Sequence, residues 1–114
     1  MARRWEIDPD AVLIARAKLG LRRSVEVKVT SQRKTAGRYK GLTGSPPVHR
    51  ITISTHNCPS EAGKTLWHEM AHARQRERYR TQVAFLRGLE ADDLEAEAES
   101  LERWNERIPL CRPS

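Results

Sequence analysis

The amino-acid sequence predicts an α+β fold built around a small three-stranded sheet. Three patterns support this prediction: a capped helical stretch near the start, short alternating stretches in the middle, and long helical stretches in the second half. The chain has 114 residues, of which 38% are hydrophobic. This length and composition suit one domain with a modest core, and no repeat or linker divides the chain. We therefore expect residues 1–114 to form a single domain.

The first element expected is a helix that begins just after Asp8. Asp8 is a favourable N-cap, Pro9 suits the first helical position, and Gly20 is a typical residue to close a helix. Between them runs an apolar stripe, made of Ala11, Val12, Ile14, Ala15 and Leu19. We expect this helix to cover one side of the sheet.

Three strands are expected before the middle of the chain. Residues 25–30 alternate valine with polar residues, which is the pattern of a half-buried strand. Residues 37–42 predict a second strand, which its glycines would make short or irregular. Residues 48–55 (VHRITIST) give the strongest strand prediction, and one of its faces carries His49, Ile51 and Ile53.

Helices dominate the rest of the chain. Ser60 is a good N-cap for a helix over residues 61–80, whose buried side would carry Leu66, Met70 and Ala73. A short apolar cluster follows at residues 82–89. We expect one final helix over residues 89–107, which Pro109 brings to an end.

Residues 65–72 read TLWHEMAH and contain the pattern His-Glu-x-x-His. Helical positions four apart lie on one face, about 6 Å apart along the axis, so His68 and His72 would direct their rings to one point. Imidazole nitrogen suits zinc, and catalytic zinc sites combine three protein ligands with an open position for water. Glu69 would lie beside a zinc-activated water and act as its general base. The alternative interpretation is two surface histidines on a charged helix.

A third metal ligand must come from another part of the chain, because no histidine follows His72. His49 and His56 precede the motif and are two candidates. The acidic stretch at residues 92–99 offers several carboxylates, although a row of glutamates on a helix is commonly a solvated face.

Two glutamates of the acidic stretch compete for the role of third ligand. Glu95 and Glu99 share a helix face, so Glu95 could bind zinc while Glu99 orients one of the histidine ligands. Glu97 lies nearer the apolar side of the same helix. Helix geometry alone does not separate Glu95 from Glu97.

The order of helix, strands, HExxH helix and acidic helix resembles that of the zincin metallopeptidases, over most of the chain. The segments AGRY at residues 36–39 and ITIS at residues 51–54, followed by TLWHEMAH, are similar to the core of SprT-like proteases. In that family a glycine-containing strand and an I-x-I-S strand precede a TLxHEMxH helix. SprT-like enzymes generally take their third zinc ligand from a later histidine, which this sequence lacks.

The second half of the chain is instead similar to the gluzincins, including the ImmA/IrrE-type proteases. Their third ligand is the first residue of an E-x-x-A-(D/N) pattern on a following helix. Residues 95–99 (EAEAE) fit this pattern, except that Glu99 stands where Asp or Asn is usual. The resemblance implies a minimal zincin fold in which Glu95 completes the zinc site of His68 and His72, with Glu99 supporting it.

The resemblance also implies peptide-bond hydrolysis, so the leading expectation is a zinc-dependent metallopeptidase with one Zn²⁺ per chain and a protein or peptide substrate. An extended substrate would pair with residues 48–55 as the sheet edge. Tyr79, His56 and Tyr39 are candidates to stabilise the oxyanion. The alternatives are a DNA-associated or regulatory binding module with a structural zinc, and a basic adaptor with no metal. Glu69 argues against a structural zinc, because such a site needs no base.

The net charge of +6 suggests an acidic partner. The excess of Lys and Arg lies before the motif, so nucleic-acid contact through the basic N-terminal half is one prediction, and a solvated basic face is the alternative. No apolar stretch resembles a signal peptide or a membrane span, so we expect no membrane contact. Cys58 and Cys111 are expected to be reduced thiols in a cytoplasmic protein. The sequence leaves the oligomeric state open.

Overall fold

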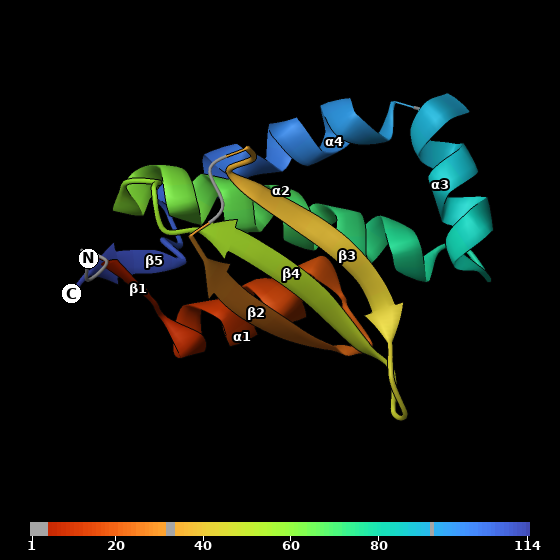
Figure 1. Cartoon of the computed structure of the whole chain (residues 1–114), viewed down its shortest axis with the longest axis horizontal. Helices are drawn as coiled ribbons and strands as arrows, with labels where there is room; N and C mark the ends of the chain where they lie inside the picture. The colour runs from red at the N-terminus through yellow and green to blue at the C-terminus, as the bar shows by residue number, and fades with distance from the viewer. Residues whose placement is uncertain (1–4, 32–33, 92) are drawn as a thin grey trace.

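The computed structural model describes residues 5–31, 34–91 and 93–114. The predicted α+β class is confirmed, and the three-stranded sheet is accompanied by a second sheet of two short strands (Figure 1). The elements in chain order are β1 (Trp5–Ile7), α1 (Pro9–Leu19), β2 (Ser24–Thr30), β3 (Gly37–Thr43), β4 (Val48–Ser54), α2 (Pro59–Glu77), α3 (Gln82–Ala91), α4 (Leu94–Leu101), the 3₁₀ helix η1 (Glu102–Glu106) and β5 (Cys111–Pro113).

The larger sheet has the strand order β2-β4-β3, with β2 parallel and β3 antiparallel to β4. The expectation that residues 48–55 form the sheet edge is therefore wrong, because β4 is the central strand. Its alternate side chains His49, Ile51 and Ile53 are all buried, which suits a strand that has a neighbour on each side. The edge beside the following helix is β3, whose register with β4 shifts between Tyr39 and Gly41.

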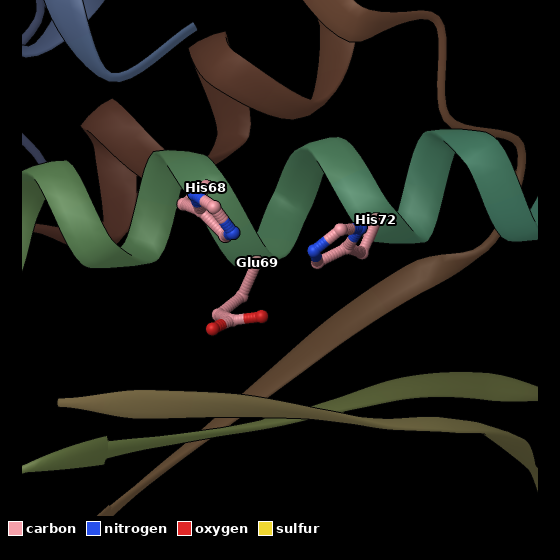
Figure 2. A group of neighbouring side chains, drawn as sticks. All are labelled: His68, Glu69 and His72. Carbon is pink, nitrogen blue, oxygen red and sulfur yellow. The ribbon is translucent and has the colours of Figure 1, made fainter. Parts of the chain in front are cut away.

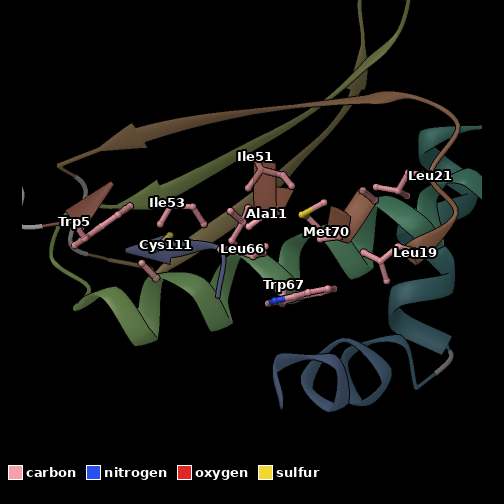
Figure 3. Packing of buried hydrophobic residues seen from close by; sticks show 14 residues of the cluster. Trp5, Ala11, Leu19, Leu21, Ile51, Ile53, Leu66, Trp67, Met70 and Cys111 are labelled. Carbon is pink, nitrogen blue, oxygen red and sulfur yellow. The ribbon is translucent and has the colours of Figure 1, made fainter. Parts of the chain in front are cut away.

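One core joins the sheet to α1 and α2 (Figure 3). Leu66 and Met70 of α2 meet Ile51 and Ile53 of β4, and Ala15 of α1 closes the same cluster. The helix α1 has the predicted cap, because the Asp8 carboxylate accepts hydrogen bonds from two backbone N–H groups. Gly20 ends this helix with a φ of 69°, a conformation that glycine adopts without steric cost.

The two ends of the described chain pair with each other. The strands β1 and β5 are antiparallel, with Trp5 opposite Pro113 (Figure 1). The Trp5 side chain is buried, and its indole N–H donates to the carbonyl of Asn57 at 2.8 Å. No pattern in either three-residue strand predicts this pairing.

The helices after the sheet differ from the prediction at their ends. The N-cap of α2 is Cys58 rather than Ser60, and Pro59 takes the first helical position. The expected continuous helix over residues 89–107 is wrong, since the chain forms α3, α4 and η1 in its place. Asp93 has a non-helical backbone as the N-cap of α4, a position that aspartate prefers to a helix interior.

Two further expectations concern the surroundings of the chain. Within the described residues, none of the helices combines the length and apolar character that crossing a membrane requires. Cys58 is exposed and Cys111 is buried, and both are free thiols. The cytoplasmic location stays a prediction.

Candidate metal centre

The helix α2 presents the HExxH motif to a cleft. Its opposite side is anchored in the core by buried residues including Trp67, whose indole N–H donates to the carbonyl of Ile108 at 3.0 Å. His68 and His72 consequently point away from the core, with ring centroids 4.9 Å apart (Figure 2). One ligand atom from each of His68, Glu69 and His72 lies within 4.8 Å of the others.

The carboxylate of Glu95 on α4 meets both histidine rings. Its two oxygens lie 3.1 Å from Nε2 of His68 and 2.8 Å from Nε2 of His72. Glu97 turns elsewhere, with Oε1 at 3.3 Å from a guanidinium nitrogen of Arg78. The structure thus brings Glu95 to the imidazoles and leaves Glu97 outside them.

The two histidines that precede the motif lie apart from this cluster. Nε2 of His49 is 2.7 Å from a carboxylate oxygen of Glu77, and Nε2 of His56 is 3.1 Å from the carbonyl of Ser31. Neither histidine lines the cleft.

The Nδ1 atom of each motif histidine is held by an oxygen. For His68 this oxygen is Oε2 of Glu102 at 3.0 Å, and for His72 it is Oε1 of Gln75 at 2.8 Å. The amide N–H of Gln75 donates to the carbonyl of Leu94 at 2.8 Å, which turns its oxygen toward His72. Because these oxygens accept the Nδ1 protons, the neutral rings keep their Nε2 lone pairs for a metal.

Sequence reasoning placed Glu99 in the supporting role, and the structure corrects this. Glu99 is exposed, whereas Glu102 holds His68. The sequence spacing could have identified Glu102 as a candidate. It lies seven residues after Glu95, which places it on the same helix face two turns further along. Gln75 could have been found in the same way, because it lies three residues after His72 on one helix and is therefore its neighbour.

The donor set of the cluster fits zinc. Two imidazole nitrogens and one carboxylate oxygen are a ligand set of catalytic zinc sites. Ligands at about 2.0–2.1 Å from a tetrahedral ion lie roughly 3.3 Å from one another. The distances of 3.1 Å and 2.8 Å from the Glu95 oxygens to the two rings are close to that separation.

Glu69 is nearly buried beside the two rings, with 8% of its surface exposed. Burial raises the pKa of its carboxyl group above the usual range, and the nearby His68 and His72 partly oppose this rise. The backbone of Tyr39 on β3 makes a smaller contribution that lowers this pKa. For His68, burial lowers the pKa, but the hydrogen bond to Glu102 and the surrounding carboxylates raise it overall.

The cleft has a volume of about 360 Å³. One wall is the edge strand β3, represented by Gly37, Arg38 and Tyr39, and the facing wall is α3, represented by Phe85 and Leu86. The histidines and Glu95 lie between these walls. The cleft is therefore polar at the cluster and apolar along α3.

Of the three candidates for oxyanion stabilisation, Tyr39 alone lines the cleft. Its hydroxyl lies 2.8 Å from Nδ1 of His49, so it is already engaged away from the histidine cluster. Tyr79 directs its hydroxyl at Gly88, where an added Cβ would lie 2.4 Å away, and His56 bonds a loop carbonyl.

Searches with this chain against protein-family models, curated proteins and solved structures find no match. The functional interpretation therefore depends on the fold and on the chemistry of the cleft.

Proposed function

We propose that this chain is a zinc-dependent metallopeptidase. One observation carries the proposal: the Glu95 carboxylate reaches Nε2 of both motif histidines, while the buried carboxylate of Glu69 lies beside the two rings. Two imidazoles, a carboxylate ligand and a separate buried carboxylate are the side chains that zinc-assisted hydrolysis requires. A structural zinc site would have no use for Glu69.

The roles of the side chains follow from their positions. His68, His72 and Glu95 would hold one Zn²⁺, with Glu102 and Gln75 orienting the rings. Bound zinc would supply a Lewis acid that polarises the substrate carbonyl and acidifies water. Glu69 takes a proton from the attacking water and later delivers it to the leaving amine. Its raised pKa suits a group that both accepts and returns a proton.

The substrate would be a protein or peptide in an extended conformation. The strand β3 borders the cleft and has a partner strand on one side only, so a peptide segment can pair with its outer edge. On the opposite wall, Leu86 is 49% exposed and offers an apolar contact for a substrate side chain. We propose that the protein acts in the cytoplasm, because both of its cysteines are free thiols and that compartment keeps thiols reduced.

The first test is the zinc content of the purified protein, measured by elemental mass spectrometry after dialysis against metal-free buffer. We expect about one zinc per chain. The zinc-loaded protein is then incubated with a mixture of peptides, and cleavage is followed by mass spectrometry. A folded protein that retains no zinc would contradict the proposal.

The Glu69→Gln variant separates an enzyme from a DNA-associated or regulatory module with a structural zinc. The enzyme loses at least about a hundredfold in cleavage rate while it still binds zinc, because only the base is removed. A module with a structural zinc has no cleavage to lose, and its zinc binding is unaffected by the substitution. Glu61→Gln is the matched control, since Glu61 is an exposed glutamate in the first turn of the same helix. Full cleavage by Glu69→Gln would overturn the mechanism.

A further inference from the structure

A second hollow, separate from the metal cleft, lies at the C-terminal end of α2. Its volume is about 480 Å³. The charged residues of its lining are Arg22, Arg23, Arg76, Arg80 and Glu77. We call it the basic hollow, because its lining contains four arginines and one glutamate.

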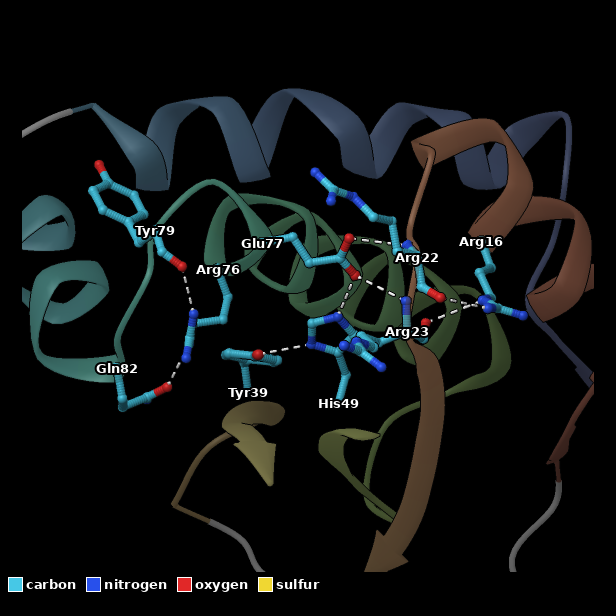
Figure 4. A network of polar contacts seen from close by, with 9 residues as sticks. All are labelled: Arg16, Arg22, Arg23, Tyr39, His49, Arg76, Glu77, Tyr79 and Gln82. Atoms are coloured by element: carbon cyan, nitrogen blue, oxygen red, sulfur yellow. Dashed lines mark hydrogen bonds and ion pairs between the residues drawn. The ribbon is translucent and has the colours of Figure 1, made fainter. Parts of the chain in front are cut away.

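The backbone that carries two of these arginines is held from both sides (Figure 4). The carboxylate of Glu77 accepts the N–H groups of Arg22 and Arg23 at 2.9 Å and 3.2 Å. The guanidinium of Arg16 donates to the carbonyls of the same two residues, at 3.1 Å and 3.0 Å. Two charged side chains thus fix the peptide segment, while the side chains of Arg22 and Arg23 stay exposed.

The single carboxylate of the hollow is fully engaged with other donors. Besides the two backbone N–H groups, Oε2 of Glu77 lies 2.7 Å from Nε2 of the buried His49. Within the described part of the chain, no carboxylate oxygen forms an ion pair with Arg22, Arg23, Arg76 or Arg80. Among the described residues, the positive charge of these four arginines is therefore not paired with a carboxylate.

The charge of Arg76 is the most unfavourable of the four to leave unpaired, since only 9% of the surface of this residue is exposed to water. Its described hydrogen bonds run to two neutral oxygens, from Nε to Oε1 of Gln82 at 3.1 Å and from Nη1 to the carbonyl of Tyr79 at 2.7 Å. A guanidinium has five N–H donors, so these bonds use two of them. A buried cation is ordinarily paired with an anion, because desolvation of an unpaired charge is unfavourable.

We propose that the basic hollow binds a phosphate group. A phosphate carries negative charge and several acceptor oxygens, which match the planar fork of arginine. The fixed backbone anchors the side chains of Arg22 and Arg23 at the hollow, and burial restricts the side chain of Arg76. Binding therefore costs less conformational entropy than it would on a mobile segment. A phosphorylated small molecule and the backbone of a nucleic acid share this chemistry. Binding here does not depend on zinc.

The test is an NMR titration of the ¹⁵N-labelled full chain with inorganic phosphate, at an ionic strength held constant with chloride. The backbone amides of Arg22 and Arg23 report on the site. We expect saturable shifts, and we expect the variant with Arg22→Gln and Arg23→Gln to bind at least about tenfold more weakly. Its fold is preserved, because the backbone groups and not the side chains of these residues bond Glu77 and Arg16.

Arg87→Gln is the matched control, since Arg87 is an exposed arginine on α3 outside the hollow. It should change phosphate affinity by less than about twofold, because it removes one positive charge from a surface outside the hollow. Phosphate shifts that do not saturate, or an equal loss of affinity in the control, would overturn the proposal.

A second titration uses an eight-nucleotide single-stranded DNA in place of phosphate. If it shifts the same amides and inorganic phosphate displaces it, the hollow is supported as a contact for the nucleic-acid backbone. If the DNA leaves these amides unchanged while phosphate shifts them, the hollow is supported as a site for a small phosphorylated molecule. If neither phosphate nor the DNA binds, the proposal is contradicted.

Discussion

Oε1 of Glu95 lies 2.8 Å from Nε2 of His72, across the gap between α4 and α2. The two residues are 23 positions apart in sequence, and α3 is the segment that folds back to bring them together. Glu97, two positions further along, contacts Gln75 and Arg78 instead. The direction of α4 relative to α2 therefore distinguishes two glutamates that helix periodicity alone leaves equivalent.

This contact predicts that Glu95→Gln lowers zinc affinity far more than Glu97→Gln. A carboxylate ligand is lost in the first variant, whereas the second removes a charge that pairs with Arg78 at the surface. We expect a loss of at least about a hundredfold for Glu95→Gln and less than about tenfold for Glu97→Gln. Competition with a chromogenic chelator measures both constants, and equal losses would show that Glu95 is not the third ligand.

The contact between Glu102 and Nδ1 of His68 predicts a smaller effect on zinc. Replacing Glu102 by Gln leaves the ligand in place but removes the charge that holds its ring, so we expect a loss of about 10- to 100-fold in affinity. Glu99→Gln is the control, since Glu99 is exposed on α4, the helix that immediately precedes Glu102. A larger loss for Glu99→Gln than for Glu102→Gln would reverse the assignment.

Periodicity predicted those parts of the site that lie within one helix. The spacing of His68 and His72 requires only a regular helix, and their rings face the same cleft. The prediction of the residue that holds the His68 ring was wrong by three positions. The choice between Glu99 and Glu102 depends on where α4 and η1 lie against α2. Such a placement is set by packing between distant segments, which a local pattern does not encode.

The sheet shows the same division between local and distant information. Local sequence predicted the strands around Val27, Tyr39 and Ile51, by alternation most clearly in the first, but strand order depends on which segments pair. The turn between β3 and β4 makes those two antiparallel, and β2 then adds to the other side of β4 through a parallel pairing. The strand β5 is too short to carry a pattern and exists because β1 lies beside it.

The close packing around Gly63 predicts that replacing it by alanine destabilises the fold. A Cβ added there would lie 2.3 Å from Oδ1 of Asn105, whose side chain cannot move freely because it accepts from the Leu110 N–H and donates to the Ser60 carbonyl. Helix propensity alone would favour alanine by about 1 kcal/mol, but overpacking costs about 1–3 kcal/mol. We expect Gly63→Ala to lower the free energy of unfolding in urea. An increase would show that α2 and η1 are less tightly apposed.

The pair of His49 and Glu77 predicts that acid destabilises the fold. Burial lowers the pKa of His49, and the hydrogen bond that its ring donates to Glu77 only partly opposes this. For Glu77, burial raises the pKa, but the bonds from His49 and from the backbone of Arg22 and Arg23 lower it overall. Both folded-state pKa values lie below the unfolded ones, so the unfolded chain binds more protons as the pH falls.

The loss of stability from this pair should begin below about pH 6.5, where an exposed histidine is protonated, and continue through the range in which a free glutamate titrates. Tyr39, Arg76 and Arg16 also face His49, and the two guanidinium groups oppose its protonation. His49→Gln removes the titrating ring, so its unfolding free energy in zinc-free urea titrations should change less steeply between pH 7 and 5, by at most about 1.4 kcal/mol per pH unit. His56→Gln, which removes an exposed histidine, should keep the wild-type slope. Identical slopes for all three proteins would mean that His49 binds its proton equally well in the folded and unfolded chains.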